Sequence, residues 1–252
     1  MLKKIILTVS ISAASAALSA ANPTESSTQM VLAFANDWNS TSGFLRLFER
    51  GACKDSWKPV GDKIACSFGK NGMGWGIGLH EDTLKLAGEP EVVEGARRTP
   101  VGAFNLSLAF GKASKKELSV KLEYKQITPT AFGVDDIKSK FYNKIVDEKV
   151  VVKDWDSAED MFDYMNQGVY LYGAFVEHNY QKPIPGKGSC FFLHVHRKPG
   201  GPTLGCTAFD ANLVKQVICW LDPAKHPVLV QLPMSVYNRL KAEWVLPEFI
   251  QP

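Results

Sequence analysis

A cysteine and a histidine in the last quarter of the chain form the pattern with the clearest chemistry. Cys206 follows Gly205 in a polar loop, and His194 belongs to the apolar run 191–196, which is typical of a strand. A turn through the Pro- and Gly-rich residues 199–202 would bring the two side chains together. The imidazole could then take the thiol proton, the sulfur could attack a carbonyl carbon, and loop N–H groups could receive the oxyanion. A buried cysteine beside a core histidine is the alternative, and spacing alone does not choose between them.

Two neighbouring features would assist this chemistry. Gly205 would let backbone approach the reacting carbonyl closely. Asp210 is expected to cap a helix over 211–221, and if that helix starts just after Cys206, its positive end would favour the thiolate. His194 and His196, with Cys206 or His178, are also zinc-ligand types, but no HExxH or paired CxxC spacing accompanies them. We therefore predict no metal and no cofactor.

The elements expected around this pair are mainly strands. Periodicity predicts strands over 30–34, 43–50 and 118–127, and a strand pair over 57–68 that turns at 61–62. Helices are expected over 156–165, opened by a capping box at 156–159, and over 135–146, 211–221 and 235–244. The glycine-rich run 72–78 lacks the spacing of phosphate loops and indicates close backbone packing or a substrate groove. We predict one mainly β domain over 30–252 with a few peripheral helices.

The N-terminus has the pattern of an export signal. Lys3 and Lys4 precede an apolar segment, and residues 1–20 end in small side chains suited to cleavage. Residues 21–29 are expected to form a mobile polar leader. The signal predicts an exported protein of the periplasm or cell envelope without a membrane span. Its removal takes the formal charge from +3 to +1, which gives no reason to expect nucleic acid as a partner.

The chain has five cysteines, an odd number for an exported protein. Cys53 and Cys66 could pair across a hairpin in an oxidising compartment. Cys190 and Cys219 lie in apolar surroundings and are expected to be buried. Cys206 alone stands in a polar, glycine-rich loop.

Several motifs resemble those of one enzyme family. Residues 99–104 read TPVGAF and look like the TPxGxF motif of L,D-transpeptidase (YkuD-like) catalytic domains, and His194 followed by TLGC at 203–206 is similar to that family's histidine and [S/T]HGC signature. The order of the motifs is the same, and the resemblance spans about 30–233. A proteobacterial branch is most similar, through VDD at 134–136, PIPGKGSCFFLH at 183–194 and LDPAK at 221–225.

The resemblance implies a fold and a reaction. The fold would be a β-sandwich of the L,D-transpeptidase type. Cys206 would be the nucleophile and His194 the general base, with the main-chain carbonyl of Val195 orienting the imidazole. Gly205 and Cys206 would supply N–H groups to the oxyanion. The reaction would be acyl transfer on peptidoglycan stem peptides, in which the sulfur attacks the carbonyl of an L-centre and expels a D-residue.

Substrate binding is assigned to residues near these motifs. They are Arg98, Arg197, Thr203, His196 and Asp136; the arginines are suited to carboxylates and Asp136 to the ammonium of a diamino acid. Solvated loops and helix caps are the competing interpretations for the charged members of this set.

Two positions depart from the family pattern. Leu204 replaces the histidine of [S/T]HGC, and Ala208 stands where better-known members have arginine or asparagine. Hydrolysis by an L,D-carboxypeptidase or cysteine amidase therefore stays open, as does a relative that binds peptidoglycan without turnover.

Overall fold

The computed structural model describes residues 22–248, and the expected export signal lies outside them. Its strands are β1 (Gln29–Ala35), β2 (Ser42–Glu49), β3 (Lys58–Ser67), β4 (Met73–Trp75), β5 (Thr99–Asn105), β6 (Leu108–Gly111), β7 (Glu123–Gln126), β8 (Ala131–Val134), β9 (Lys144–Asp147), β10 (Ala158–Asp160), β11 (Tyr172–Phe175), β12 (Phe192–Val195), β13 (Thr207–Phe209) and β14 (Val228–Pro233). Its α-helices are α1 (Lys115–Leu118), α2 (Met161–Asn166), α3 (Ala211–Trp220) and α4 (Met234–Leu240), with 3₁₀ turns at Asp82–Leu84 and Pro223–Lys225.

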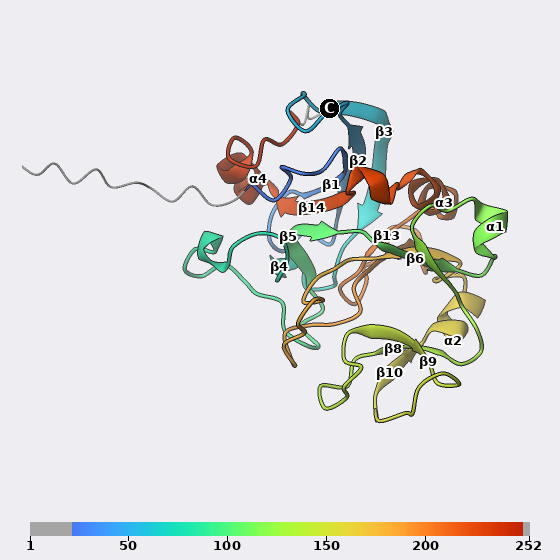
Figure 1. Cartoon of the computed structure of the whole chain (residues 1–252). Coiled ribbons are helices and arrows are strands. Elements are labelled where there is room, and N and C mark those ends of the chain that lie inside the picture. Colours follow the sequence, from blue (N-terminus) through green and yellow to red (C-terminus); the bar gives the residue numbers. More distant parts are fainter. Residues whose placement is uncertain (1–21, 249–252) are drawn as a thin grey trace, which may run out of the picture.

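Most strands belong to one large curled sheet (Figure 1). Its order is β4-β5-β14-β1-β2-β3-β13-β12-β11-β6-β7, and β14 lies between β1, to which it is parallel, and β5, to which it is antiparallel. Every residue of β1 and of β14 is buried, because both strands are apolar nearly throughout and have neighbours on both edges. The predicted mainly β class is confirmed.

A second sheet packs near one end of the first. Its order is β10-β8-β9, and it lies at the bottom of Figure 1 together with α2. Helix α2 contacts β8, α3 lies against β11 and β12, and α4 against β14. One apolar cluster joins the small sheet and α2 to Phe175 of β11 and Phe192 of β12, so they form a wall beside the strands near the predicted reactive residues.

Several predicted elements differ from those observed. The strand pair expected over 57–68 is wrong. One strand, β3 (Lys58–Ser67), takes its place, because Gly61 adopts a φ of +68° at a bulge instead of closing a turn. The stretch 118–127 contains the end of α1, then Ser119 at a φ of +57°, and only then β7. The helix expected over 135–146 is wrong: turns occupy most of it, Asn143 has a φ of +62°, and β9 follows.

The remaining helices agree in place and differ in their ends. The helix over 211–221 is confirmed as α3, and the Asp210 side chain accepts hydrogen bonds from two of its first N–H groups. The capping box at 156–159 is wrong, because residues 158–160 pair as β10 and Asp160 caps α2 instead. Helix α4 runs from Met234 to Leu240, so the helix expected over 235–244 begins one residue earlier and ends four residues sooner.

The expected polar leader packs on the large sheet from residue 22 onward. Thr24 and Ser27 are buried, and the Thr24 hydroxyl donates to the carbonyl of Trp244 at 2.8 Å. The buried Arg50 guanidinium donates to the carbonyls of Ser27 at 2.7 Å and Thr24 at 2.5 Å. This segment is therefore held in place through its backbone, a contact that its polar side chains do not reveal.

The five cysteines are all unpaired. Cys66 is buried near one end of β3, whereas Cys53 lies in the exposed connection that enters the opposite end. About eight strand residues at roughly 3.3 Å each separate those ends, far more than a disulfide spans. The Cys53–Cys66 pairing that the sequence left open is therefore not formed.

Candidate active site

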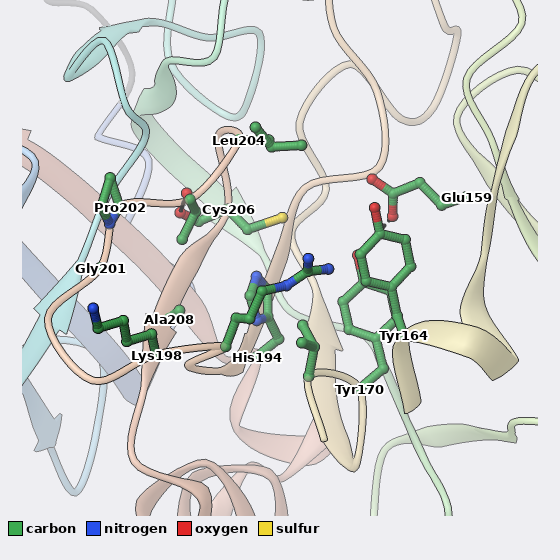
Figure 2. A pocket seen from close by; sticks show the side chains of 13 residues that line it. Glu159, Tyr164, Tyr170, His194, Lys198, Gly201, Pro202, Leu204, Cys206 and Ala208 are labelled. Atoms are coloured by element: carbon green, nitrogen blue, oxygen red, sulfur yellow. Dashed lines mark hydrogen bonds between the residues drawn. The ribbon is translucent and has the colours of Figure 1, made fainter. Parts of the chain in front are cut away.

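Neighbouring strands bring Cys206 and His194 together. Strands β12 and β13 are parallel, with His194 opposite Ala208, so Cys206 stands two residues before the partner of His194. The chain returns through the loop 196–206 without a helix. Both side chains line one pocket of about 320 Å³ (Figure 2). The predicted juxtaposition of thiol and imidazole in one concave site is present.

The imidazole of His194 is oriented by main chain. Its Nδ1 lies 2.8 Å from the carbonyl oxygen of Val195, which can only accept, so Nδ1 carries the proton and Nε2 is left as the acceptor. The ring is buried and meets the ring of Tyr170 edge-on, with centroids 5.5 Å apart. Burial lowers the pKa of His194 to about 4, since it disfavours the charged form. At neutral pH the ring is therefore an uncharged base.

The thiol of Cys206 is held by backbone. Its Sγ accepts the N–H of Phe192 at 3.3 Å, and the thiol approaches the carbonyl of Cys190 at 3.6 Å. Burial raises the pKa of Cys206, and the nearby Glu159 carboxylate raises it further. Among residues 22–248 the sulfur has no hydrogen bond to His194. The resting pair is therefore neutral, and the thiolate expected from the sequence is not the resting form.

Helix α3 does not change this result. It begins at Ala211, after the whole of β13, and its first N–H groups are already bound by the Asp210 carboxylate. The predicted assistance from a helix end beside Cys206 is therefore wrong.

The two N–H groups beside the sulfur, those of Gly205 and Cys206, differ in their availability. The Gly205 N–H donates to the hydroxyl of Thr203 at 3.0 Å, and that hydroxyl donates to the Cys206 carbonyl at 2.6 Å. Within the described chain the Cys206 N–H has no acceptor, so it remains available to an oxyanion. Gly205 is needed for its conformation, with a φ of +145° and a Cβ position only 2.6 Å from the Phe191 ring. Its predicted N–H contribution to the oxyanion is not available in this arrangement.

The TPVGAF motif supports the loop from outside the pocket. The Thr99 hydroxyl accepts the N–H of Gly69 at 2.8 Å and donates to the Cys206 carbonyl at 3.3 Å. Gly102 has a φ of +140°, and a Cβ there would lie 2.0 Å from the His80 ring. Thr99 of the motif thus holds the Cys206 carbonyl through a hydrogen bond, and Gly102 leaves space for the buried ring of His80.

The predicted substrate-binding residues divide into two groups. Arg197 and Thr203 line the pocket, where the Arg197 guanidinium lies 5.2 Å from the Tyr164 ring centroid. Arg98, His196 and Asp136 are not among the lining residues. Arg98 donates to the Met73 carbonyl at 2.9 Å.

The placements of His196 and Asp136 have simple causes. Strand β12 ends at Val195, so alternation no longer keeps His196 on the face of His194, and His196 lines a different cavity with Ser67 and Met234. Asp136 accepts the N–H groups of Lys138 and Asp156 and so stabilises a turn, which lowers the pKa of its carboxyl.

The other candidates from the sequence have structural contacts. His178 is buried between Phe104 and Phe191, accepts the N–H of Ile77 at Nδ1, and has Nε2 2.8 Å from the Lys187 carbonyl oxygen. Over residues 22–248 no group of three or more His, Cys, Asp or Glu side chains is arranged to hold a metal ion. The glycines of the 72–78 run permit close packing, since a Cβ at Gly72 or Gly78 would overlap a backbone carbonyl.

Sequence reasoning missed one wall of the pocket. Glu159, Tyr164 and Tyr170 line it from the small sheet, α2 and the turn that follows α2 (Figure 2). The sequence predicts a capping box that includes Glu159, and no short-range pattern links Glu159, Tyr164 or Tyr170 to Cys206. Lys198, Leu204 and Ala208 complete the side nearest the Cys206 loop.

Comparison with known proteins gives no relative: no family model, no curated protein and no solved structure matches the chain. Across residues 22–248, no helix has the length and apolar character needed to cross a bilayer.

Proposed function

We propose that this protein is an exported cysteine acyltransferase of the L,D-transpeptidase type, which acts on peptidoglycan stem peptides through a thioester at Cys206. The observation that carries the proposal is the arrangement of Cys206 and His194 in one pocket, with Nδ1 of the imidazole committed to Val195 and Nε2 left as a base. The curled large sheet would then be this protein's version of the family's β-sandwich.

Acylation would begin from the neutral pair. The thiol proton passes to Nε2 of His194 as the sulfur attacks the carbonyl carbon of an L-centre, and the Cys206 N–H receives the oxyanion. The C–N bond to the D-residue breaks, and the leaving amine takes the proton from His194. Because burial disfavours both charged forms, proton transfer accompanies the attack instead of preceding it.

Deacylation uses the same two groups in reverse. A nucleophile attacks the thioester carbonyl, loses a proton to His194, and the sulfur departs and receives that proton. The N–H of Phe192, 3.3 Å from Sγ, favours negative charge on the leaving sulfur.

Hydrolysis is the second candidate function, because the two departures from the family motif lie at the pocket. Leu204 is 67% exposed and lines the pocket, and Ala208 lines it beside Cys206. Two polar groups that would contact substrate are thereby replaced by apolar ones. Incubation with a stem tetrapeptide and an amine acceptor separates the two: a cross-linked product supports transfer, and tripeptide alone supports hydrolysis.

The proposal is tested by covalent labelling. A carbapenem should add to the native protein at Cys206, as read by intact mass and peptide mapping, and Cys206→Ala should abolish both the adduct and stem-peptide turnover. Cys53→Ala is the matched control, because that thiol is exposed and outside the pocket. An adduct at another residue, or turnover by Cys206→Ala, would remove the basis of the assignment, and an ordered pocket without turnover would leave a peptidoglycan-binding role.

A further inference from the structure

The pocket contains a carboxylate that the acylation chemistry does not use. Glu159 lies on β10 opposite Gly133 of β8, and a Cβ on Gly133 would lie 3.7 Å from the Glu159 Cβ and 3.2 Å from the Cys190 sulfur. Figure 2 shows its carboxylate extending into the pocket from the small-sheet side, and the Cys206 sulfur pointing toward that side. The small sheet thus presents an acid to the reactive thiol.

We propose that Glu159 binds the ammonium group of the acyl acceptor and takes one of its protons, so that a neutral amine attacks the thioester. This inference rests on the proposed function and concerns its second half-reaction. It makes Glu159 an acceptor-binding residue and identifies the acceptor class as a primary amine.

The surroundings of Glu159 leave it without a cation. Its one hydrogen bond among the described residues comes from the Tyr170 hydroxyl, at 2.6 Å, and no ion pair involves it. A carboxylate has about four acceptor positions, so most remain open. The charged groups that act on its pKa, Asp135 and Glu94, have the same sign and raise it.

This lack of compensation has an energetic consequence. A half-buried carboxylate without a positive partner is costly, and desolvation raises the pKa of Glu159 to about 7. A carboxyl with that pKa can accept and release a proton near neutral pH. An incoming ammonium supplies the missing positive charge and the proton together.

The positive charges of the pocket suit the other part of the substrate. Arg197 and Lys198 line it, and Arg197 contacts Tyr164. Neither forms an ion pair with Glu159, so both remain able to receive a carboxylate of the donor peptide.

The transfer balances as follows. The ammonium gives one proton to the Glu159 carboxylate, and the neutral nitrogen then forms a bond to the thioester carbon while the C–S bond breaks. The nitrogen loses a second proton to Nε2 of His194, which passes it to the sulfur. The products are an amide, a neutral Cys206 thiol and a protonated Glu159, which returns its proton to solvent.

The test compares acceptors on the acylated protein. A stem tetrapeptide is the donor, and the acceptors are Nα-acetyl-lysine amide, an ammonium, and hydroxylamine, which is uncharged at neutral pH. Glu159→Gln should lower the ratio of aminolysis to hydrolysis with the lysine derivative about ten- to hundredfold, the usual effect of losing a hydrogen bond to a charged group. It should leave the ratio with hydroxylamine within about threefold. Removal of the Glu159 charge also changes the ionisation of Cys206, so the comparison uses the ratio of products from the acylated protein and not the acylation rate. Glu148→Gln, an exposed carboxylate after β9, is the control.

A binding measurement makes the result independent of turnover. In the Cys206→Ala protein, NMR titration with Nα-acetyl-lysine amide should show at least about tenfold weaker binding after Glu159→Gln. Equal binding, or an unchanged lysine-to-water ratio with normal acylation, would overturn the role of Glu159 and leave the proposed function intact. A protein that gives only hydrolysed product at every amine concentration would also overturn it. Failure of Cys206 to be acylated would instead remove the proposed function. The NMR titration alone would then decide whether Glu159 binds the ammonium group.

Discussion

Replacement of Thr203 by valine is the sharpest test of how the Cys206 loop is held. The main chain of Thr203 is fixed on both sides, because its N–H donates to Phe68 and its carbonyl accepts from Lys70. The side chain then closes the loop through its bonds to the Gly205 N–H and the Cys206 carbonyl. Valine has the same shape and makes neither bond.

The expected effect follows from those two bonds. The hydrogen bond to the Cys206 carbonyl contributes about 1 kcal/mol, and a buried Gly205 N–H left without a partner costs about another 1 kcal/mol or more. If the positioned loop is what the transition state needs, a loss of about 2 kcal/mol slows acylation about thirtyfold. Thr203→Ser keeps the hydroxyl and should stay within a few-fold of the native rate.

The assay is the rate of carbapenem acylation of Cys206 by intact mass, together with the melting temperature. The loop is local, so Thr203→Val should change the melting temperature by only a few degrees. An acylation rate equal to or above that of the native protein would refute the reasoning, because it would mean that the released Gly205 N–H assists the oxyanion. A serine variant as slow as the valine variant would show that the methyl group, and not the hydroxyl, sets the loop.

Three further predictions concern protonation and packing. Since burial raises the pKa of Cys206, the rate of its alkylation by iodoacetamide should keep rising from pH 6 to pH 9, about tenfold per pH unit. A rate that does not change with pH near neutrality would instead indicate a preformed thiolate–imidazolium pair. Burial lowers the pKa values of His80, His178 and His194 and raises that of Glu159. Between about pH 6.5 and 4 the three histidines bind protons more readily in the unfolded chain, and together they outweigh the opposite effect of Glu159. The free energy of unfolding should therefore fall as the pH falls through that window. Urea melts at pH 7, 6 and 5 measure this, and a rise in the free energy of unfolding would contradict it. Arg50→Met should lower the free energy of unfolding by about 3 kcal/mol, because it removes buried charged hydrogen bonds to the carbonyls of Thr24 and Ser27. The control is Arg46→Met, which removes a more exposed arginine and should lower the free energy of unfolding by less than about 1 kcal/mol. Equal losses in denaturant melts would show that residues 22–28 are not held through Arg50.

The sequence predicted the parts of the fold that depend on local pattern. Buried strands such as β1 and the capped helix α3 have signals within ten residues. These signals are an apolar run for the strand, and an Asp just ahead of an amphipathic stretch for the helix. The failures lie where a distant partner decides. Residues 158–160 pair with β8 and so do not begin a helix, and Asn143 adopts a positive φ while its side chain binds the carbonyls of His178 and Asn179.

The same distinction applies to the site. Cys206, His194 and Val195 were identified because the resemblance places them in motifs, and the main-chain hydrogen bond to Val195 is present. Glu159, Tyr164 and Tyr170 belong to a separate sheet, a helix and a turn, and only tertiary packing brings them to the thiol. Asp136 shows the reverse case, since an acidic residue in a motif serves a turn and not the pocket.

The position of β14 has a consequence for how the chain acquires its structure. Among residues 22–248 the last strand, β14, lies between the first strand, β1, and β5, so the large sheet cannot close until residues 228–233 are available. Closing a loop of about 200 residues is entropically slow, and sheets dominated by such distant pairings form in milliseconds to seconds. A nascent chain that emerges gradually from a ribosome or a translocation channel would therefore keep an open sheet until residues 228–233 are released. Truncation before Val228 should give an insoluble product even though Cys206 and His194 are both present.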